Sequence, residues 1–300
     1  MYTKHFGLSE KPFSLIPDAD SIYFSPGHQA AFNMLEFGLL ESGGITVITG
    51  EVGAGKTTLI RHLLSRIDYH ELNVALINTA HSAYGSLLRW ITNGYRIDAG
   101  QRDEGELLCL LQDYLIEQYG QGKRSVVIVD EAQNIDKFQM ESLRLLTNIN
   151  ADRAQLLQII LIGQPELLKT FNDPSMSQLA QRVSADYHLD PLSLQDTMNY
   201  VHHRVEAVGG TRKLFEDRAL MAVYYFTGGI PRLINTLCDT GLLFAYSLDH
   251  TSVTLEVIMA AVHAKRIGGI HRAGITTDPA RENVRQHLKK MTGQDMQDLL

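Results

Sequence analysis

Short runs of apolar and β-branched residues recur between residues 45 and 189, and a turn or a helix pattern follows each run. Continuous apolar runs of this kind are typical of strands buried on both faces, as in a parallel sheet. The runs that predict strands are Ile45–Thr49, Val74–Asn78, Val126–Val129 and Ile159–Ile162, with a weaker fifth at Asp186–Leu189.

Stretches with helical periodicity separate these runs. They are Thr58–Ile67, Ser82–Thr92, Glu104–Tyr119 and Lys137–Thr147. Because strands alternate with helices, the sequence predicts an α/β domain with a doubly wound parallel sheet.

The pattern changes after Pro191, where helical stretches follow one another without a strand between them. These stretches are Ser193–Val208, Glu216–Thr227, Pro231–Ser247 and Leu255–Ala264. Proline suits the first position of a helix, since the backbone N–H there has no partner within the helix. The sequence therefore predicts a second, small and all-helical domain.

The chain is expected to divide into four parts. Residues 1–44 are an N-terminal linker and helix, residues 45–192 the α/β domain, residues 193–267 the helical domain, and residues 268–300 a polar tail. The tail is expected to be partly helical or disordered, with one amphipathic helix at Arg281–Met291.

Composition places the chain among globular proteins, because 44% of its 300 residues are hydrophobic and 20% are charged. The N-terminus lacks the apolar core of a signal peptide, and charged residues and glycines interrupt the most apolar region. The two cysteines form no metal-ligand spacing and no disulfide framework. A soluble cytoplasmic protein without a transmembrane segment is therefore expected.

The formal net charge of −7 argues against a surface that binds nucleic acid as a whole. The last 36 residues, however, hold seven Lys or Arg and only four Asp or Glu. This basic tail is a hint of an anionic partner.

The segment Gly50–Thr57 matches the P-loop pattern G-x-x-x-x-G-K-[ST] between a predicted strand and a predicted helix. Its glycines allow backbone N–H groups to surround phosphate oxygens at a helix N-terminus. Lys56 would reach the β- and γ-phosphates, and Thr57 would bind Mg²⁺. The alternative is a glycine-rich turn with an incidental lysine. The predicted nucleotide-binding residues are Gly50, Glu51, Val52, Gly53, Ala54, Gly55, Lys56, Thr57 and Thr58.

An acidic pair follows the predicted strand Val126–Val129. Asp130 would hold Mg²⁺ through water, since Mg²⁺ keeps much of its hydration shell. Glu131 is the natural base or orienter for the attacking water. Adjacent acids alone would more often be a solvated turn, but together with the P-loop they indicate ATP hydrolysis.

Phosphoryl transfer also needs polar and cationic groups around the γ-phosphate. Gln164 directly follows the strand Ile159–Ile162, while Arg182 and Arg232 stand beside predicted helices. Taken singly, each arginine is more often a surface residue, and the alternative for Gln164 is a helix cap or a turn residue before Pro165.

These residues resemble an AAA+ ATPase, in which a P-loop α/β domain precedes a helical lid. More narrowly, the chain resembles the ExeA/GspA-type ATPases of bacterial secretion and pilus systems, from about Tyr2 to Arg266. The matching segments, in order, are Phe6-Gly7-Leu8, Lys11-Pro12-Phe13, Pro17-Asp18, Gly27-His28, Thr49–Thr58, Val129–Gln133, Leu161–Leu167, Gln181-Arg182-Val183 and Gly229–Arg232.

The resemblance implies roles for the outlying residues. Gln164 would occupy the sensor-1 position, Arg232 would be the sensor-2 arginine of the lid, and Arg182 would be an arginine finger that reaches the ATP of a neighbouring subunit. Phe6–Phe13 would lie near the adenine. A homo-oligomer whose sites are completed by Arg182 in trans is therefore expected.

Longer members of the family continue into a transmembrane segment and a periplasmic peptidoglycan-binding domain, and the resemblance leads us to expect a short form without either. The chain is more similar to short forms such as the MshM-type pilus biogenesis ATPases, with a location in the cytoplasm or peripheral to the inner membrane. The related TnsC/TniB-type transposition regulators assemble on DNA.

Three hypotheses follow. The chain is an ATPase that energises or regulates assembly of a secretion, pilus or envelope system, with the proteins of that system as partners. Alternatively it is a DNA-bound ATPase that regulates transposition, or an ATP-binding module whose hydrolysis is incidental. The acidic chain and the N-terminal Phe6–Phe13 segment favour the first.

Overall fold

The computed structural model describes residues 1–14, 22–40, 44–78, 85–151, 154–264, 278–293 and 295. The chain packs into two compact units. One contains Met1–Ser25, Val52–Thr58 and Asp190–Leu300, and the other contains Pro26–Glu51 and Leu59–Leu189. They are called the helical unit and the sheet unit below.

The sheet unit is built on five parallel strands in the order β2-β3-β6-β1-β7. The strands are β1 (Ile45–Gly50), β2 (Leu72–Ile77), β3 (Arg124–Val129), β6 (Leu157–Gly163) and β7 (Val183–Leu189). Every residue of β1 and β6 is buried, which explains their largely apolar and β-branched sequences. The predicted parallel sheet is confirmed.

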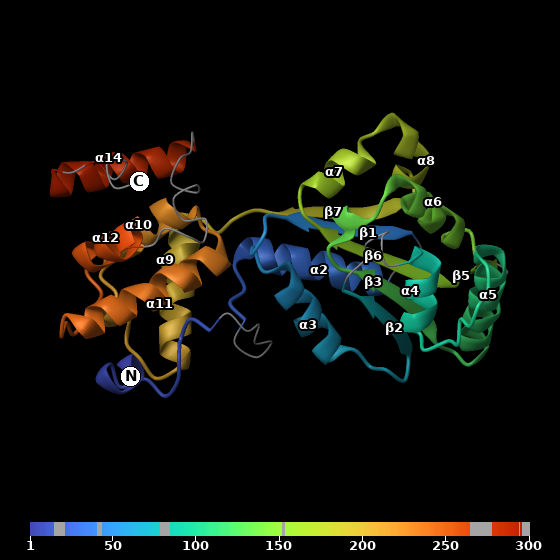
Figure 1. Cartoon of the computed structure of the whole chain (residues 1–300), viewed down its shortest axis with the longest axis horizontal. Coiled ribbons are helices and arrows are strands. Elements are labelled where there is room, and N and C mark those ends of the chain that lie inside the picture. The colour runs from blue at the N-terminus through green and yellow to red at the C-terminus, as the bar shows by residue number, and fades with distance from the viewer. Residues whose placement is uncertain are drawn as a thin grey trace. The chain divides into compact units, whose positions relative to one another are not determined.

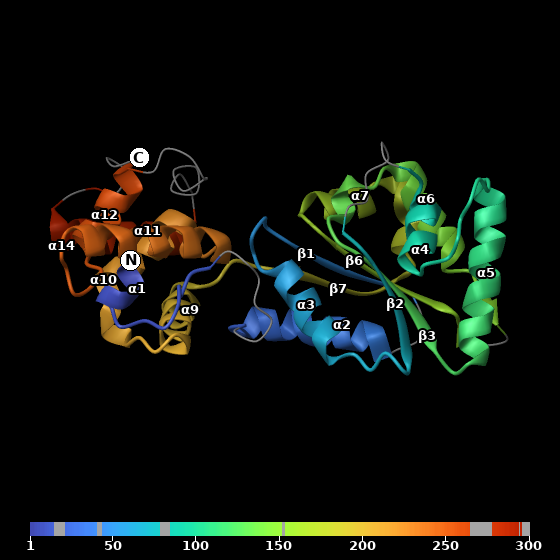
Figure 2. The same ribbon diagram turned by 60° about the horizontal axis from the view of Figure 1, so that its bottom comes forward.

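Helices cover both faces of this sheet (Figure 2). One face carries α2 (Pro26–Leu40) and α3 (Lys56–Arg66). The other carries α4 (Leu87–Gly94), α5 (Glu104–Gly120), α6 (Lys137–Leu146) and α7 (Glu166–Phe171). Between and after these elements lie η2 (Ala132–Asn134), η3 (Pro174–Met176), α8 (Ser177–Ala180) and the short antiparallel pair β4 (Asn150–Ala151) and β5 (Ala154–Gln155). The pair β4–β5 and α7 were not predicted, and Ser82–Tyr84 of a predicted helix lie outside the described residues.

The helical unit contains α9 (Leu194–Ala207), α10 (Asp217–Thr227), α11 (Pro231–Ser247), α12 (Leu255–Ala264) and α14 (Pro279–Thr292), with η4 (Arg212–Leu214) after α9 (Figure 1). The predicted helix starts are explained locally. The hydroxyl of Ser193 caps α9 by accepting the Asp196 backbone N–H at 3.1 Å, and Pro231 is the first residue of α11.

The first fourteen residues, which include α1 (Tyr2–His5), pack on the helical unit. The buried hydroxyl of Tyr2 donates to Asp239 on α11, and the Arg204 guanidinium donates to the carbonyl of Pro12 at 2.7 Å. Phe13 meets Phe215 edge to face. The segment predicted as one N-terminal part, residues 1–44, thus contributes α1 to the helical unit and α2 to the sheet unit.

No helix in the described part of the chain combines the length and the apolar character needed to cross a bilayer.

Candidate nucleotide-binding site

The P-loop connects the carboxyl end of β1 to the start of α3. Gly53 and Gly55 have φ angles of 82° and 106°, which side chains rarely tolerate, so glycine is needed at both turns. Lys56 begins α3 and is only 7% exposed. The first backbone N–H groups of a helix have no partner within it, and the helix dipole adds positive charge there. The arrangement suits the phosphates of a nucleotide.

Arg232, the predicted sensor of the helical domain, lies against the P-loop within the helical unit. Its backbone N–H donates to the Gly53 carbonyl at 3.2 Å, and a Cβ atom on Gly53 would stand 2.6 Å from the Arg232 Cβ. This bond gives a partner to one of the free N–H groups at the start of α11. The structure therefore brings Arg232 and the P-loop together.

The turn before Arg232 is held by Gly229. The backbone N–H of Leu192 donates to the Gly229 carbonyl at 2.9 Å, and Gly229 has a φ angle of 75°. A Cβ atom at Gly229 would lie 1.9 Å from the Leu192 carbonyl oxygen. The close approach fixes the start of α11 against the segment that leads into α9.

Asp130 and Gln164 follow two adjacent strands of the sheet, β3 and β6, at their carboxyl ends. Asp130 is 5% exposed, its backbone N–H donates to Ile77, and its carboxylate accepts the Glu131 N–H at 2.9 Å. Glu131 has φ 54° and ψ 38°, the left-handed region that residues other than glycine seldom adopt. Strained backbone of this kind concentrates at functional sites.

Three side chains meet in a hydrogen-bonded network beside Asp130. The Oε2 atom of Glu131 accepts Nε2 of Gln133 at 2.6 Å and Nε2 of Gln164 at 3.1 Å. The Oε1 atom of Gln133 accepts the backbone N–H of Gln164 at 2.9 Å. The structure thus brings Glu131 and Gln164 together. Gln133 also belongs to this network. The sequence predicted no role for it, because only the pairing of β3 with β6 places it beside Gln164.

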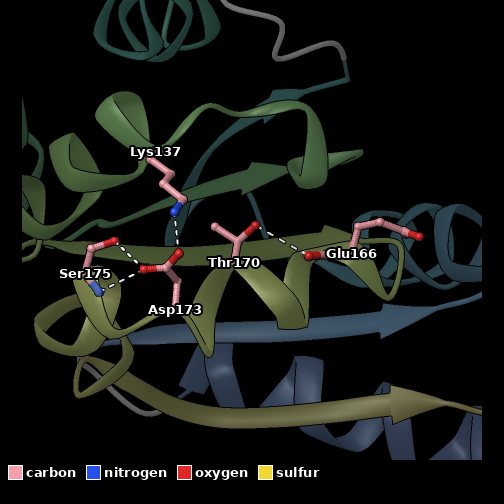
Figure 3. Close-up of polar contacts among 5 residues, drawn as sticks. All are labelled: Lys137, Glu166, Thr170, Asp173 and Ser175. Carbon is pink, nitrogen blue, oxygen red and sulfur yellow. Dashed lines mark hydrogen bonds and ion pairs between the residues drawn. The ribbon is translucent and has the colours of Figure 1, made fainter.

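A second contact joins the segments that follow Glu131 and Gln164 (Figure 3). Lys137, the first residue of α6, forms an ion pair with Asp173, which lies after α7. The carboxylate of Asp173 also accepts the backbone N–H of Ser175 at 2.9 Å and its hydroxyl at 2.6 Å. The pKa of Asp173 lies well below its usual range, and the hydrogen bond from Lys137 is the main cause.

Arg182 lies at the opposite end of the strands, where the amino end of β1 lies. Its carbonyl accepts the N–H of Ile45, the first residue of β1, and its guanidinium donates to Asn148 Oδ1 at 2.9 Å. The carboxyl ends of β1, β3 and β6 form the other edge, because the strands are parallel. The structure therefore does not bring Arg182 to Asp130, Glu131 or Gln164 of its own chain.

A magnesium ion fits the predicted ligands by its chemistry. Among the described residues, no group of three or more His, Cys, Asp or Glu is arranged to hold a metal ion. Mg²⁺ bound to a nucleotide needs only one or two protein oxygens, because phosphate and water supply the remainder. The hydroxyl of Thr57 and the buried carboxylate of Asp130 are oxygen ligands of the required type.

Comparison with known proteins agrees with this geometry. Residues 40–171 match the family model of the AAA domain. Over 272 residues the chain is 42% identical to General secretion pathway protein A of Aeromonas hydrophila, an alignment that covers 89% of this chain and 49% of that protein. The chain is a homologue of General secretion pathway protein A. It spans about half the length of this curated relative.

Solved structures show the same fold at low sequence identity. Cdc6p of Pyrobaculum aerophilum superposes with a TM-score of 0.64 at 15% identity, covering 95% of this homologue and 84% of that chain. The ORC2 protein of Aeropyrum pernix, in its ADPNP-ADP complexes, gives 0.59 at 15% identity, covering 96% and 85%. RuvB of Thermotoga maritima gives 0.52 at 14% identity, covering 94% and 80%. The predicted AAA+ fold, with a parallel sheet followed by helices, is confirmed.

Proposed function

We propose that this chain binds ATP with Mg²⁺ and hydrolyses it. The observation that carries the proposal is the hydrogen bond from Gln164 to the Glu131 carboxylate. It lies at the sheet edge where β3 delivers Asp130 and β1 leads into the P-loop. A fortuitous glycine-rich turn would not need a buried acid, a strained glutamate and a polar sensor at that edge.

The residues have separate tasks in this proposal. The backbone of Gly50–Thr58 and the Lys56 ammonium bind the phosphates, while Thr57 and Asp130 hold Mg²⁺, which neutralises phosphate charge. The Glu131 carboxylate orients a water molecule and takes its proton as the water oxygen attacks the γ-phosphorus. The bond between that phosphorus and the β–γ bridging oxygen breaks in the same step, so ADP leaves with the bridging oxygen and its electron pair. Gln164 and Arg232 stabilise the negative charge that moves onto the phosphate oxygens.

We further propose that residues 193–267 act as a lid on the nucleotide and that Phe6–Phe13 contact the adenine. The contact of Arg232 with Gly53 supports a lid, because it ties the start of α11 to the loop that would hold the phosphates. The ORC2 protein was solved in ADPNP-ADP complexes, which supports a nucleotide in this fold.

For the biological process we propose assembly or regulation of a bacterial secretion, pilus or envelope system. The support is the 42% identity to General secretion pathway protein A. The alternative, a DNA-bound regulator of transposition, would draw on the basic tail. In the described part of that tail, Arg285 and Lys289 form ion pairs with Glu282 and Asp295, which lowers the charge left for DNA phosphates.

The test of ATP hydrolysis uses two variants. Lys56→Ala is expected to abolish binding of a fluorescent ATP analogue, since the phosphates lose their cation. Glu131→Gln is expected to bind ATP normally and to hydrolyse it roughly 10²–10⁴-fold more slowly, the usual contribution of a general base. The measurements are nucleotide affinity and steady-state phosphate release.

Matched controls are Lys169→Ala and Glu166→Gln, which alter exposed residues of α7. Both should behave as the parent chain does. Equal hydrolysis by Glu131→Gln and the parent would remove Glu131 from its role as the base. Duplex DNA added at low salt distinguishes the two processes, because a DNA-dependent ATPase would be stimulated and its DNA affinity would fall steeply with salt.

A further inference from the structure

The side chain of Gln133 links the proposed base to a neighbouring strand end. Its Nε2 atom donates to Glu131 Oε2 at 2.6 Å, and its Oε1 atom accepts the Gln164 backbone N–H at 2.9 Å. Both ends of one amide group are therefore engaged. One end holds a flexible carboxylate and the other a fixed backbone atom that follows β6.

Local structure explains why this amide reaches both partners. Glu131 adopts left-handed backbone angles and precedes η2, so its side chain and that of Gln133 turn toward each other. The residue before Gln164 is Gly163. A Cβ atom there would stand 2.9 Å from Gln133 Oε1 and 3.3 Å from the Gln133 backbone nitrogen. The missing side chain at Gly163 leaves the space that the amide occupies.

Energetic considerations argue against an incidental contact of Gln133 with Glu131 and Gln164. Glutamate and glutamine side chains both lose conformational entropy when they are fixed in one rotamer. Glu131 Oε2 accepts two amide donors, from Gln133 and Gln164, and hydrogen bonds to a carboxylate are stronger than neutral ones. The network therefore holds the Glu131 carboxylate in one orientation at a cost in side-chain entropy.

We propose that Gln133 is a positioning residue for Glu131. Through its amide, Gln133 fixes the direction of the carboxylate and couples it to the backbone at Gln164. A shift of the segment after β6 is thereby transmitted to Glu131. This inference rests on the proposed ATP hydrolysis, because the carboxylate is positioned for the attacking water.

Two variants separate positioning from packing. Gln133→Ala removes both contacts. Gln133→Glu keeps the size of the side chain and an oxygen that accepts the Gln164 N–H, but it replaces the donor to Glu131 with a second carboxylate. Both variants are expected to lower kcat by roughly ten- to a hundredfold, the scale for a misplaced catalytic group, with affinity for the ATP analogue unchanged.

The matched control is Gln121→Ala. Gln121 donates its Nε2 to the Glu117 carboxylate at 3.2 Å on the exposed end of α5, which is the same chemical contact in a place without a proposed role. Its kcat, its ATP affinity and its thermal unfolding midpoint should equal those of the parent.

The pH profile of Gln133→Glu gives a readout that a structural role would not change. Two adjacent carboxylates repel each other, and a proton taken up by the pair restores a hydrogen bond between them. The ratio of kcat for this variant to kcat for the parent is therefore expected to rise as pH falls from about 8 to about 6. Gln133→Ala has no such group, so its ratio should stay flat over that range.

Gly163→Ala tests the same contact from the other side, since a Cβ atom there would stand 2.9 Å from Gln133 Oε1, although it would also stand 3.0 Å from Leu167 Cδ2. This change should lower kcat, and its effect should be smaller in the Gln133→Ala background than in the parent, because the amide that it displaces is absent there. Parent-like kcat in both Gln133 variants of an active chain would overturn this inference and leave ATP hydrolysis intact. A loss of ATP binding equal to the loss of kcat would also overturn it. A parent chain without ATPase activity would overturn both proposals.

Discussion

Gly229 has a larger structural effect than its size suggests, because its hydrogen atom takes a place that a methyl group cannot. Its φ angle is positive, and the Leu192 carbonyl oxygen stands where a Cβ atom would be. The turn that it forms leads directly into Pro231 and Arg232. Gly229, which has no proposed chemical role, therefore sets the position of Arg232, which has one.

Gly229→Ala is expected to destabilise the fold by roughly 3 kcal/mol or more, since backbone strain and a steric clash act together. Gly209→Ala is the matched control, because Gly209 has a φ angle of 82° but open space around its Cβ position. Strain alone should cost that variant about 1–2 kcal/mol. Chemical denaturation measures both, and equal losses would show that the contact with Leu192 is easily relieved.

At the scale of elements, a contact between the α6 and α7 segments stabilises the part of the sheet unit that carries Glu131 and Gln164. The ion pair between Lys137 and Asp173 joins the start of α6 to the end of the α7 segment (Figure 3). Exposed pairs contribute little on their own and are weakened by salt. Asp173 contributes more to stability than the ion pair alone would, because its carboxylate also accepts the backbone N–H and the hydroxyl of Ser175.

The lowered pKa of Asp173 predicts a pH dependence of stability. A carboxyl group whose pKa is depressed on folding stabilises the fold above its unfolded pKa of about 3.9, and this contribution is lost as pH falls toward the folded value. The unfolding midpoint of Asp173→Asn should therefore lie below that of the parent near pH 6, and the gap should narrow below about pH 4. Thermal denaturation over that range measures it.

The control is the same substitution in a Lys137→Ala background. Without the ammonium partner, the gap caused by Asp173→Asn should be smaller near neutral pH. An undiminished gap would assign the effect to Ser175 rather than to the ion pair.

At the scale of the whole molecule, one parallel sheet separates Arg182 from the polar residues it is proposed to assist. Arg182 bonds to the first residue of β1, whereas Gly50 ends that strand. The five steps between the six residues of β1, at about 3.3 Å each, put roughly 16 Å between these backbone positions. Its guanidinium is held by Asn148 on the same edge. A role for Arg182 in hydrolysis therefore requires a second copy of the chain.

We expect ATPase activity per chain to rise with protein concentration and Arg182→Ala to be inactive while still binding ATP. An equal mixture of Lys56→Ala and Arg182→Ala should recover activity, because the first supplies the arginine and the second an intact nucleotide site. Mixing Lys56→Ala with Glu131→Gln is the control, since a base that acts in its own subunit is not replaced in this way. If the first mixture remained as inactive as its components, the trans role would be wrong.

The sequence by itself determined the features that depend on neighbouring residues. Apolar runs and helical periodicity predicted the five strands of the main sheet and, in the helical unit, α9 to α12 and α14. The spacing of Gly50–Thr57 predicted the P-loop at the junction of β1 and α3. The resemblance to ExeA/GspA-type ATPases is confirmed by the comparisons. The roles of the single site residues stay predictions.

Only the tertiary structure decided which distant residues meet. Strand order set Gln164 beside Glu131 and let Gln133 bridge them, and parallel pairing put Arg182 at the far edge. Likewise, packing placed α1 on the helical unit although it precedes the sheet in sequence. Local pattern could not reveal these contacts, because each depends on burial and pairing between segments that are far apart along the chain.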